Sequence, residues 1–359
     1  MKKILTLIIA LLSIISQAQN GAPASPYYNG FNWSQTGMTL KDALATKITN
    51  THTKELSYSQ VWEALKIVDL DPANSSNVLL VYGWENGTDA DVTNDRTRAK
   101  TNNGGSNGQW NREHIFAQAL GNPDLGQTGP GADAQMLRAC DVQKNGSRGN
   151  RLYTSGSGNA AAVGSNNWYP GDEWKGDVAR IILYMYLRYG SQCLPTYVAT
   201  GTTISTDSNV PEILLQWNAE DPVSQNEDNR NTYLGNASNT YGQGNRNPFI
   251  DNPYLATVIW GGPVAQNRWP TIFLSSPRFD FASKISVFPN PSFDGNLTIS
   301  TEENLSEIDV ISVNGQIIKE YKNLEKTNLN YNLNSLPKGF YFIRFSTENQ
   351  TAVKKITVN

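Results

Sequence analysis

The residue pattern of the chain changes near residue 276. Upstream, the sequence is rich in Trp, Asn and Gly; downstream, it consists of short alternating apolar runs separated by Pro-Asn and Asn-Gly turns. Such runs lie at 285–288, 297–299, 308–313, 316–319, 340–345 and 353–358, with Asn314-Gly315 as a hairpin turn between the third and fourth. Short strands with regular turns are typical of a small β-sandwich. We therefore expect two domains, at residues 20–275 and 276–359.

The first eighteen residues have the pattern of a secretory signal. Lys2 and Lys3 precede an apolar run from Ile4 to Ile15, and the small residues of Ser16-Gln17-Ala18 follow it. The run is shorter than the ~20 residues that span a bilayer, and no later stretch approaches that length. We predict that residues 1–18 are a signal peptide rather than an uncleaved membrane anchor, and that the mature protein is exported without a transmembrane segment.

The net charge and the small number of Cys and His residues exclude several classes of function. The net charge is -3 with no basic tail, so strong nonspecific capture of nucleic acid is not indicated. Only two Cys and two His occur, which excludes cysteine-rich zinc modules and multi-histidine metal centres. A metal would have to be held mainly by oxygen. Export would place Cys140 and Cys193 in an oxidising compartment, and the sequence leaves open whether they form a disulfide.

Periodicity predicts the main elements of the first domain. Apolar residues at spacings of three and four indicate amphipathic helices over 40–48 and 58–65, and a core helix over 177–189. The run at 78–82 is short and apolar, as in a buried strand, and 102–108 is a Gly- and Asn-rich loop. The expected fold class is α+β.

Two short segments carry the residue types of phosphodiester hydrolysis. Glu113 and His114 are adjacent, so an extended backbone directs them to opposite faces. Asn145 and Arg148 are three apart and share a face if they lie on a helix. Hydrolysis of a phosphodiester needs a base, a hard cation and positive charge for the transition state. His114, a cation on Glu113 and Asn145, and Arg148 would supply them.

Each signal is weak by itself. An adjacent Glu-His pair is more often a surface or capping pair, and Arg148 and Arg151 could simply solvate a turn. His52 is expected on the surface.

Five sequence blocks together resemble the bacterial secreted endonuclease I family. They occur in that family's order over about residues 40–260, at 111–114, 137–150, 175–180, 217–222 and 243–249. The resemblance implies a ββα-metal nuclease domain with surrounding helices, in which a strand delivers the histidine and a following helix the asparagine.

The resemblance also implies roles for the candidate residues. His114 would be the general base, Glu113 and Asn145 would bind one Mg²⁺, with Ca²⁺ or Mn²⁺ as alternatives, and Arg148 would be a catalytic phosphate contact. DNA, RNA or both would be cut with little sequence specificity, leaving 5′-phosphates. The loop at 243–247 is expected to pack behind the site. Asp177 and Arg180 are expected to form a structural ion pair.

One departure from the family pattern motivates a competing hypothesis. Gln135 and Met136 stand where many relatives have a His and an Asn. If the His and Asn of those relatives order the residues around the metal, their loss would weaken metal binding or alter the nucleic-acid preference. The alternative is a catalytically inactive nucleic-acid or surface-binding protein that retains the nuclease fold. A peptidase-type zinc hydrolase is disfavoured because further histidines are absent.

The tail resembles the C-terminal sorting domain of the type IX secretion system. The resemblance rests on residues 285–291, 314–316, 336–341 and 354–358. It implies the type IX secretion machinery as a partner, and a protein that is secreted or attached to the cell surface. The alternative is a generic β-sandwich for adhesion or carbohydrate binding. The tail sequence has no His, no Cys and no acidic cluster, so we do not expect catalysis there.

Overall fold

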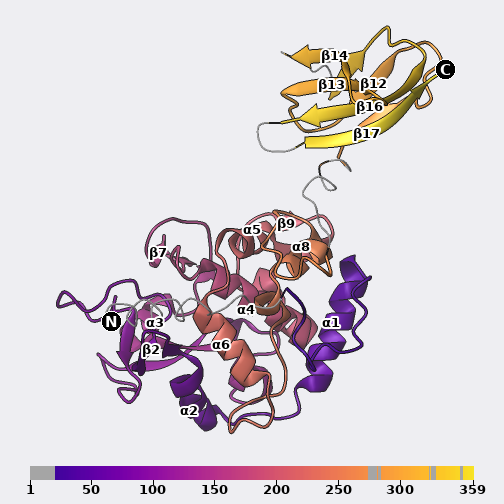
Figure 1. The fold of residues 1–359 in the computed structure, drawn as a ribbon. Helices are drawn as coiled ribbons and strands as arrows, with labels where there is room; N and C mark the ends of the chain where they lie inside the picture. The colour runs from indigo at the N-terminus through magenta and orange to yellow at the C-terminus, as the bar shows by residue number, and fades with distance from the viewer. Residues whose placement is uncertain (1–20, 274–280, 282–283, 323, 325–328, 348–350) are drawn as a thin grey trace, which may run out of the picture. The chain divides into compact units, whose positions relative to one another are not determined.

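A computed structural model describes residues 21–273, 281, 284–322, 324, 329–347 and 351–359 (Figure 1). The predicted signal peptide and the composition change near 276 lie outside these residues. The chain divides into two compact units, one ending at Ile272 and the other beginning at Phe273. Each unit is described by itself. No helix within the described ranges is long and apolar enough to cross a bilayer.

Three predicted helices are present in the first unit. They are α1 (Gly37–Thr51), α2 (Tyr58–Val68) and α4 (Lys175–Tyr189). A capping box, in which Ser57 and Gln60 satisfy each other's backbone N–H groups, fixes the start of α2. Helix α4 is buried along nearly its whole length and packs against α1 and α5 (Glu212–Glu220).

The centre of the first unit has ββα connectivity. Strand β4 (Trp110–His114) pairs antiparallel with β5 (Leu137–Asp141), and α3 (Val142–Arg148) follows directly. The α+β prediction is confirmed. The remaining elements are β1 (Leu70–Asp71), β2 (Asn74–Leu79), β3 (Thr97–Ala99), β6 (Leu152–Tyr153), β7 (Ala161–Val163), β8 (Asn167–Tyr169), β9 (Thr203–Ile204), β10 (Asp207–Pro211), α6 (Gln225–Leu234), α7 (Pro248–Asp251) and α8 (Tyr254–Trp260).

The strand predicted over 78–82 is only partly correct. Strand β2 ends at Leu79, although Leu80, Val81 and Tyr82 are also buried. The chain turns there, and Tyr82 has a left-handed backbone with φ of 72°. An apolar run reports burial, and burial alone does not distinguish a strand from a buried turn.

A network of buried charges joins β5, α4, α6 and the end of α2. Arg138 pairs with Asp69 at 2.9 Å and with Asp177 at 2.7 Å. Arg180 pairs with Glu227 at 2.6 Å and with Asp177 at 3.5 Å, which confirms the predicted Asp177–Arg180 pair. Because each of these charges has an opposite partner, their burial is tolerated and the four elements are held in one arrangement.

The second unit consists of two antiparallel sheets, as expected for a β-sandwich. One contains β11 (Ser286–Phe288), β12 (Leu297–Ser300) and β15 (Asn330–Leu333). The other has the order β14 (Ile317–Lys322), β13 (Glu307–Ser312), β16 (Gly339–Ser346) and β17 (Thr351–Val358). Its buried cluster is apolar and includes Ile299, Ile308, Val310, Ile343, Phe345 and Ile356.

The predicted strands of the tail are confirmed, but β15 was missed. In Asn330–Leu333 only Tyr331 and Leu333 face the core, and asparagines fill the other positions. Asparagine is depleted in strands, so the alternation was too weak to recognise.

Candidate active site

Strand β4 separates the candidate residues onto its two faces. Glu113 is buried, while His114, the last residue of the strand, is half-buried. Helix α3 packs on the Glu113 side, because the Asn145 Nδ2 atom donates to Asn111 Oδ1 at 2.8 Å and to the Arg112 carbonyl at 3.3 Å. Asn111 and Glu113 alternate with His114 along the strand. Glu113 and Asn145 therefore lie on the same side of the sheet.

A hydrogen-bonded chain holds the Glu113 carboxylate. Its Oε1 atom accepts from the Tyr82 hydroxyl at 2.9 Å and lies 3.3 Å from Arg148 Nη1. The Tyr82 and Tyr153 hydroxyls are 2.6 Å apart, and Tyr153 donates to the Ile115 carbonyl at 3.0 Å. Burial raises the pKa of Glu113 to about 7, against the opposing effect of Arg148.

Two oxygens at this position suit a hard cation. The side-chain hydrogen bonds of the two groups use Glu113 Oε1 and Asn145 Nδ2, and the backbone N–H of His114 also donates to the Glu113 carboxylate. A carboxylate with a neutral amide oxygen is a donor pair that Mg²⁺ or Ca²⁺ accepts, and Mg²⁺ completes its shell with water and phosphate oxygens. The residues present therefore fit the implied ion.

The contacts of His114 define its tautomer. Its Nε2 atom lies 3.0 Å from the Gly131 carbonyl oxygen, which can only accept, so Nε2 carries the proton and Nδ1 is left as the base. The Tyr58 ring stacks on the imidazole with a centroid separation of 5.7 Å. Burial lowers the pKa of His114 to about 4, so the ring is neutral at pH 7.

Arg148 points into the protein. Its side chain is 1% exposed, and it donates from Nη1 to the His114 carbonyl at 2.8 Å and from Nη2 to the Ile115 carbonyl at 3.0 Å. Asn145 and Arg148 do lie on one helix, as expected, but that part of α3 is packed against β4. In this placement the Arg148 guanidinium binds Glu113 and the backbone carbonyls at the end of β4. It does not face solvent, where the expected contact with a substrate phosphate would be made.

The prediction for His52 was wrong. It is half-buried, with Arg188 Nε 3.2 Å from Nδ1 and Gln243 Nε2 3.1 Å from Nε2. Its partners come from α4 and from a loop almost 200 residues away, so the neighbouring sequence could not indicate its burial.

The remaining candidates are interior residues. Gln243, Asn245 and Asn247 are fully buried. Gln135 donates from Nε2 to the Asn245 carbonyl at 3.0 Å, and Met136 is fully buried. Cys140 and Cys193 are both free and buried.

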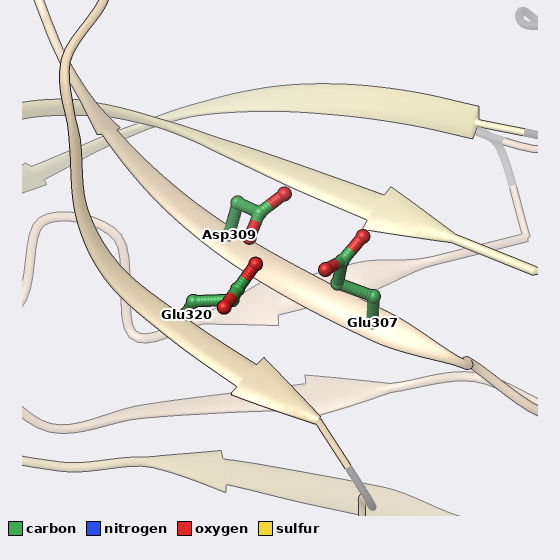
Figure 2. Close-up of side chains that lie close together, drawn as sticks. All are labelled: Glu307, Asp309 and Glu320. Atoms are coloured by element: carbon green, nitrogen blue, oxygen red, sulfur yellow. The ribbon is translucent and has the colours of Figure 1, made fainter.

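The tail contains a carboxylate cluster that its sequence did not reveal (Figure 2). Strand pairing sets Asp309 opposite Glu320, and their oxygens and those of Glu307 lie within 4.8 Å of one another. However, Lys322 Nζ is 3.0 Å from Glu320 and 3.4 Å from Glu307, and Arg344 binds Asp309 at 2.6 Å. The expectation of no acidic cluster was wrong because strand register assembles it. Since cations of the chain already neutralise it, the cluster is a weaker metal candidate than the Glu113 site.

Sequence reasoning missed the groups that hold the site together. Tyr82, Tyr153 and Gly131 come from three separate segments, and each contacts Glu113, its network or His114. Tyr82 reaches Glu113 from a left-handed backbone, a costly conformation that is concentrated at functional sites. No local pattern marks these residues.

Comparisons with known proteins match both units. The family model described as endonuclease I matches residues 36–254, and the model of a secretion system C-terminal sorting domain matches residues 286–359. An extracellular ribonuclease of Bacillus amyloliquefaciens is 42% identical over 249 residues, covering 67% of this chain and 79% of the relative. An extracellular ribonuclease of Bacillus subtilis (strain 168) is 41% identical over 262 residues, covering 70% and 84%.

Proposed function

The chain belongs to the endonuclease I family and is a secreted or cell-surface nuclease, and from this premise we propose that it is a metal-dependent endonuclease with little sequence specificity. In this proposal it hydrolyses phosphodiester bonds of RNA, DNA or both and leaves 5′-phosphate ends. The names of the two Bacillus relatives support RNA as a substrate. The sorting tail supports export by the type IX secretion machinery.

The observation that carries the proposal is the anchored imidazole of His114. The bond to Gly131 directs the free lone pair of Nδ1 away from the protein carbonyl, and the ring is neutral at physiological pH. A neutral, oriented imidazole can take a proton from a water molecule that attacks phosphorus. His114 is therefore proposed as the general base.

Glu113 and Asn145 are proposed to hold a Mg²⁺ ion through Oε2 and Oδ1. When bound, such an ion neutralises developing charge on the phosphate and the departing oxygen. Tyr82 and Arg148 position Glu113 from the protein side, and Arg148 also fixes the carbonyls of residues 114 and 115. Arg148 is thus a positioning residue in this mechanism.

The test is digestion of supercoiled plasmid and total RNA by the full chain, with Mg²⁺, Ca²⁺, Mn²⁺ or EDTA. EDTA should stop cleavage, and His114→Ala should lower the rate by about 10²–10⁴-fold, the usual contribution of a general base. His52→Gln, at the other histidine of the chain, is the matched control and should cut normally. Cleavage at the full rate by His114→Ala would reject the mechanism. Binding without cleavage by the wild type under every cation would instead favour the inactive nucleic-acid-binding protein.

A further inference from the structure

Arg112 lies beside the proposed general base and has no role in the mechanism above. It is two residues before His114, and both side chains contact Tyr58, so they share one face of β4. Tyr58 and Trp62 are four apart on α2 and present their rings on one side. The Arg112 guanidinium carbon lies 3.5 Å from the Tyr58 ring centroid and 4.3 Å from that of Trp62. The flat group is held between helix and strand.

The charge of Arg112 is not compensated within the described part of the chain. Its Nη1 atom donates to the Tyr58 carbonyl, but Nε is buried without a partner and no bond from Nη2 is found there. None of the described carboxylates forms an ion pair with it. The buried arginines of the same unit have carboxylate partners (Arg98, Arg138, Arg148, Arg180 and Arg230), whereas the half-buried Arg151 and Arg188, like Arg112, pair with none of the described carboxylates. Partial burial lowers the pKa of Arg112, which reflects the cost of desolvating its charge without an opposite partner.

An anionic ligand on this face would remove that cost. Residues two apart on a strand are separated by about 6.6 Å, close to the separation of successive phosphates along a nucleic-acid strand. A guanidinium presents donors in a planar fork that matches phosphate oxygens, and stacking on Tyr58 and Trp62 fixes its orientation in advance. His114 is the last residue of β4, so a substrate strand that continues from the cleaved bond along the face of His114 brings the next phosphate to Arg112.

We propose that Arg112, clamped by Tyr58 and Trp62, binds the phosphate next to the scissile one. The inference rests on the proposed nuclease function and adds a substrate contact to it. Arg112 thereby takes the phosphate-binding task that the sequence assigned to Arg148. The competing explanation is that the stack only ties α2 to β4.

The decisive experiment neutralises one phosphate at a time. The substrate is a 5′-labelled single-stranded oligonucleotide, of the sugar type that the enzyme cuts better, with one methylphosphonate linkage at a known position. Full-length wild type should cut about tenfold less at a linkage adjacent to the neutral one, because it loses a charge-assisted hydrogen bond. Distant cuts in the same lane are the internal reference. Arg112→Gln should cut more weakly everywhere and show no local deficit.

Steady-state kinetics gives a second readout. Arg112→Gln should raise KM about tenfold more than it changes kcat, and should reduce the slope of log binding against log salt by about 0.7–0.9. Arg96→Gln, which removes another half-exposed arginine, one paired with Glu173 at 2.5 Å, is the control and should change neither KM nor slope. Arg112→Lys retains charge without the planar fork and should keep part of the local deficit. If Arg112→Gln proves too unstable to assay, Arg112→Lys tests the proposal in its place.

The outcomes separate this proposal from the one on which it rests. A local deficit in Arg112→Gln equal to that of the wild type, or an unchanged KM and salt slope, would overturn the phosphate contact and leave only the structural clamp. If the wild type produces no cleavage ladder with any cation, the nuclease proposal itself fails.

Discussion

The two units differ in what they bury. The nuclease unit encloses a network of opposite charges, including Asp69, Arg138, Asp177 and Arg180, and places Glu113 beside it. The tail buries an almost wholly apolar cluster between two sheets. Apolar burial stabilises a fold without specifying directions, whereas buried ion pairs require defined partners. The proposed catalytic residues lie in the unit whose interior has directional contacts.

The largest expected effect tests the buried network. Arg138→Ala should destabilise the nuclease unit by about 3–5 kcal/mol, because it leaves Asp69 and Asp177 buried without this partner. Lys284→Ala, which removes an exposed ion pair of the tail, should cost less than about 1 kcal/mol. Urea unfolding followed by Trp fluorescence reports on the first unit, since all 9 Trp precede residue 270, and far-ultraviolet circular dichroism of the same samples also follows the strands of the tail. Equal stabilities of Arg138→Ala and wild type would show that the buried ion pairs do not stabilise the first unit more than the exposed pair stabilises the tail.

The next prediction compares the carboxylate of Glu113 with the carboxylate cluster of the tail. Glu113→Gln should lower activity more than about 100-fold, equivalent to about 2.7 kcal/mol, because changes even around metal ligands cost 10–100-fold. It should also raise the Mg²⁺ concentration that gives half-maximal rate. The double change Glu307→Gln and Glu320→Gln should leave plasmid and RNA digestion unchanged. Loss of digestion in the double variant would place essential chemistry in the tail.

A pH effect of opposite sign is expected in the two units. Burial raises the pKa of Asp221 to about 6 from 3.8, so between about pH 4 and 6 the folded state binds more protons than the unfolded state. Relative to Asp221→Asn, the wild type should therefore lose about 2 kcal/mol as pH rises through that window. In the tail, the backbone N–H of Asn296 lowers the pKa of exposed Asp294, so that group favours folding at higher pH.

Urea titrations of Asp221→Asn, Asp294→Asn and wild type at several pH values measure both signs. A constant difference between the wild type and Asp221→Asn from pH 4 to 7 would contradict the assignment for Asp221.

The smallest effects should be alike in the two units. Ser57→Ala removes the N-cap of α2 and should cost about 1 kcal/mol. Gly315→Ala forces alanine into the left-handed conformation of the β13–β14 turn, where φ is 81°, and should cost about 1 kcal/mol or slightly more. Calorimetry on the full chain would show each change in one transition. A cost above about 3 kcal/mol for either would mean that these local signals also have a tertiary role.

Local patterns predicted a large part of this molecule. The helices at α1, α2 and α4 and the principal strands of the tail follow from periodicity and turn residues, and the ββα unit from the family resemblance. Residue types and spacing, together with the family resemblance, also identified Glu113, His114 and Asn145 as candidates. Two of the failures have a common physical cause: whether Leu80–Tyr82 continue a strand, and whether His52 is covered, depends on segments distant in the sequence.

The sequence by itself determined the periodic helices, most strands of the tail and the candidate residues for hydrolysis, because these depend on residue type and on neighbours a few positions apart. Only the tertiary structure decided how those residues are used. It turned Arg148 inward onto backbone carbonyls, placed Arg112 beside His114 with no ion pair to any described carboxylate, and assembled Glu307, Asp309 and Glu320 through strand register. Packing and register join residues that are far apart in the chain, and no local pattern carries that information.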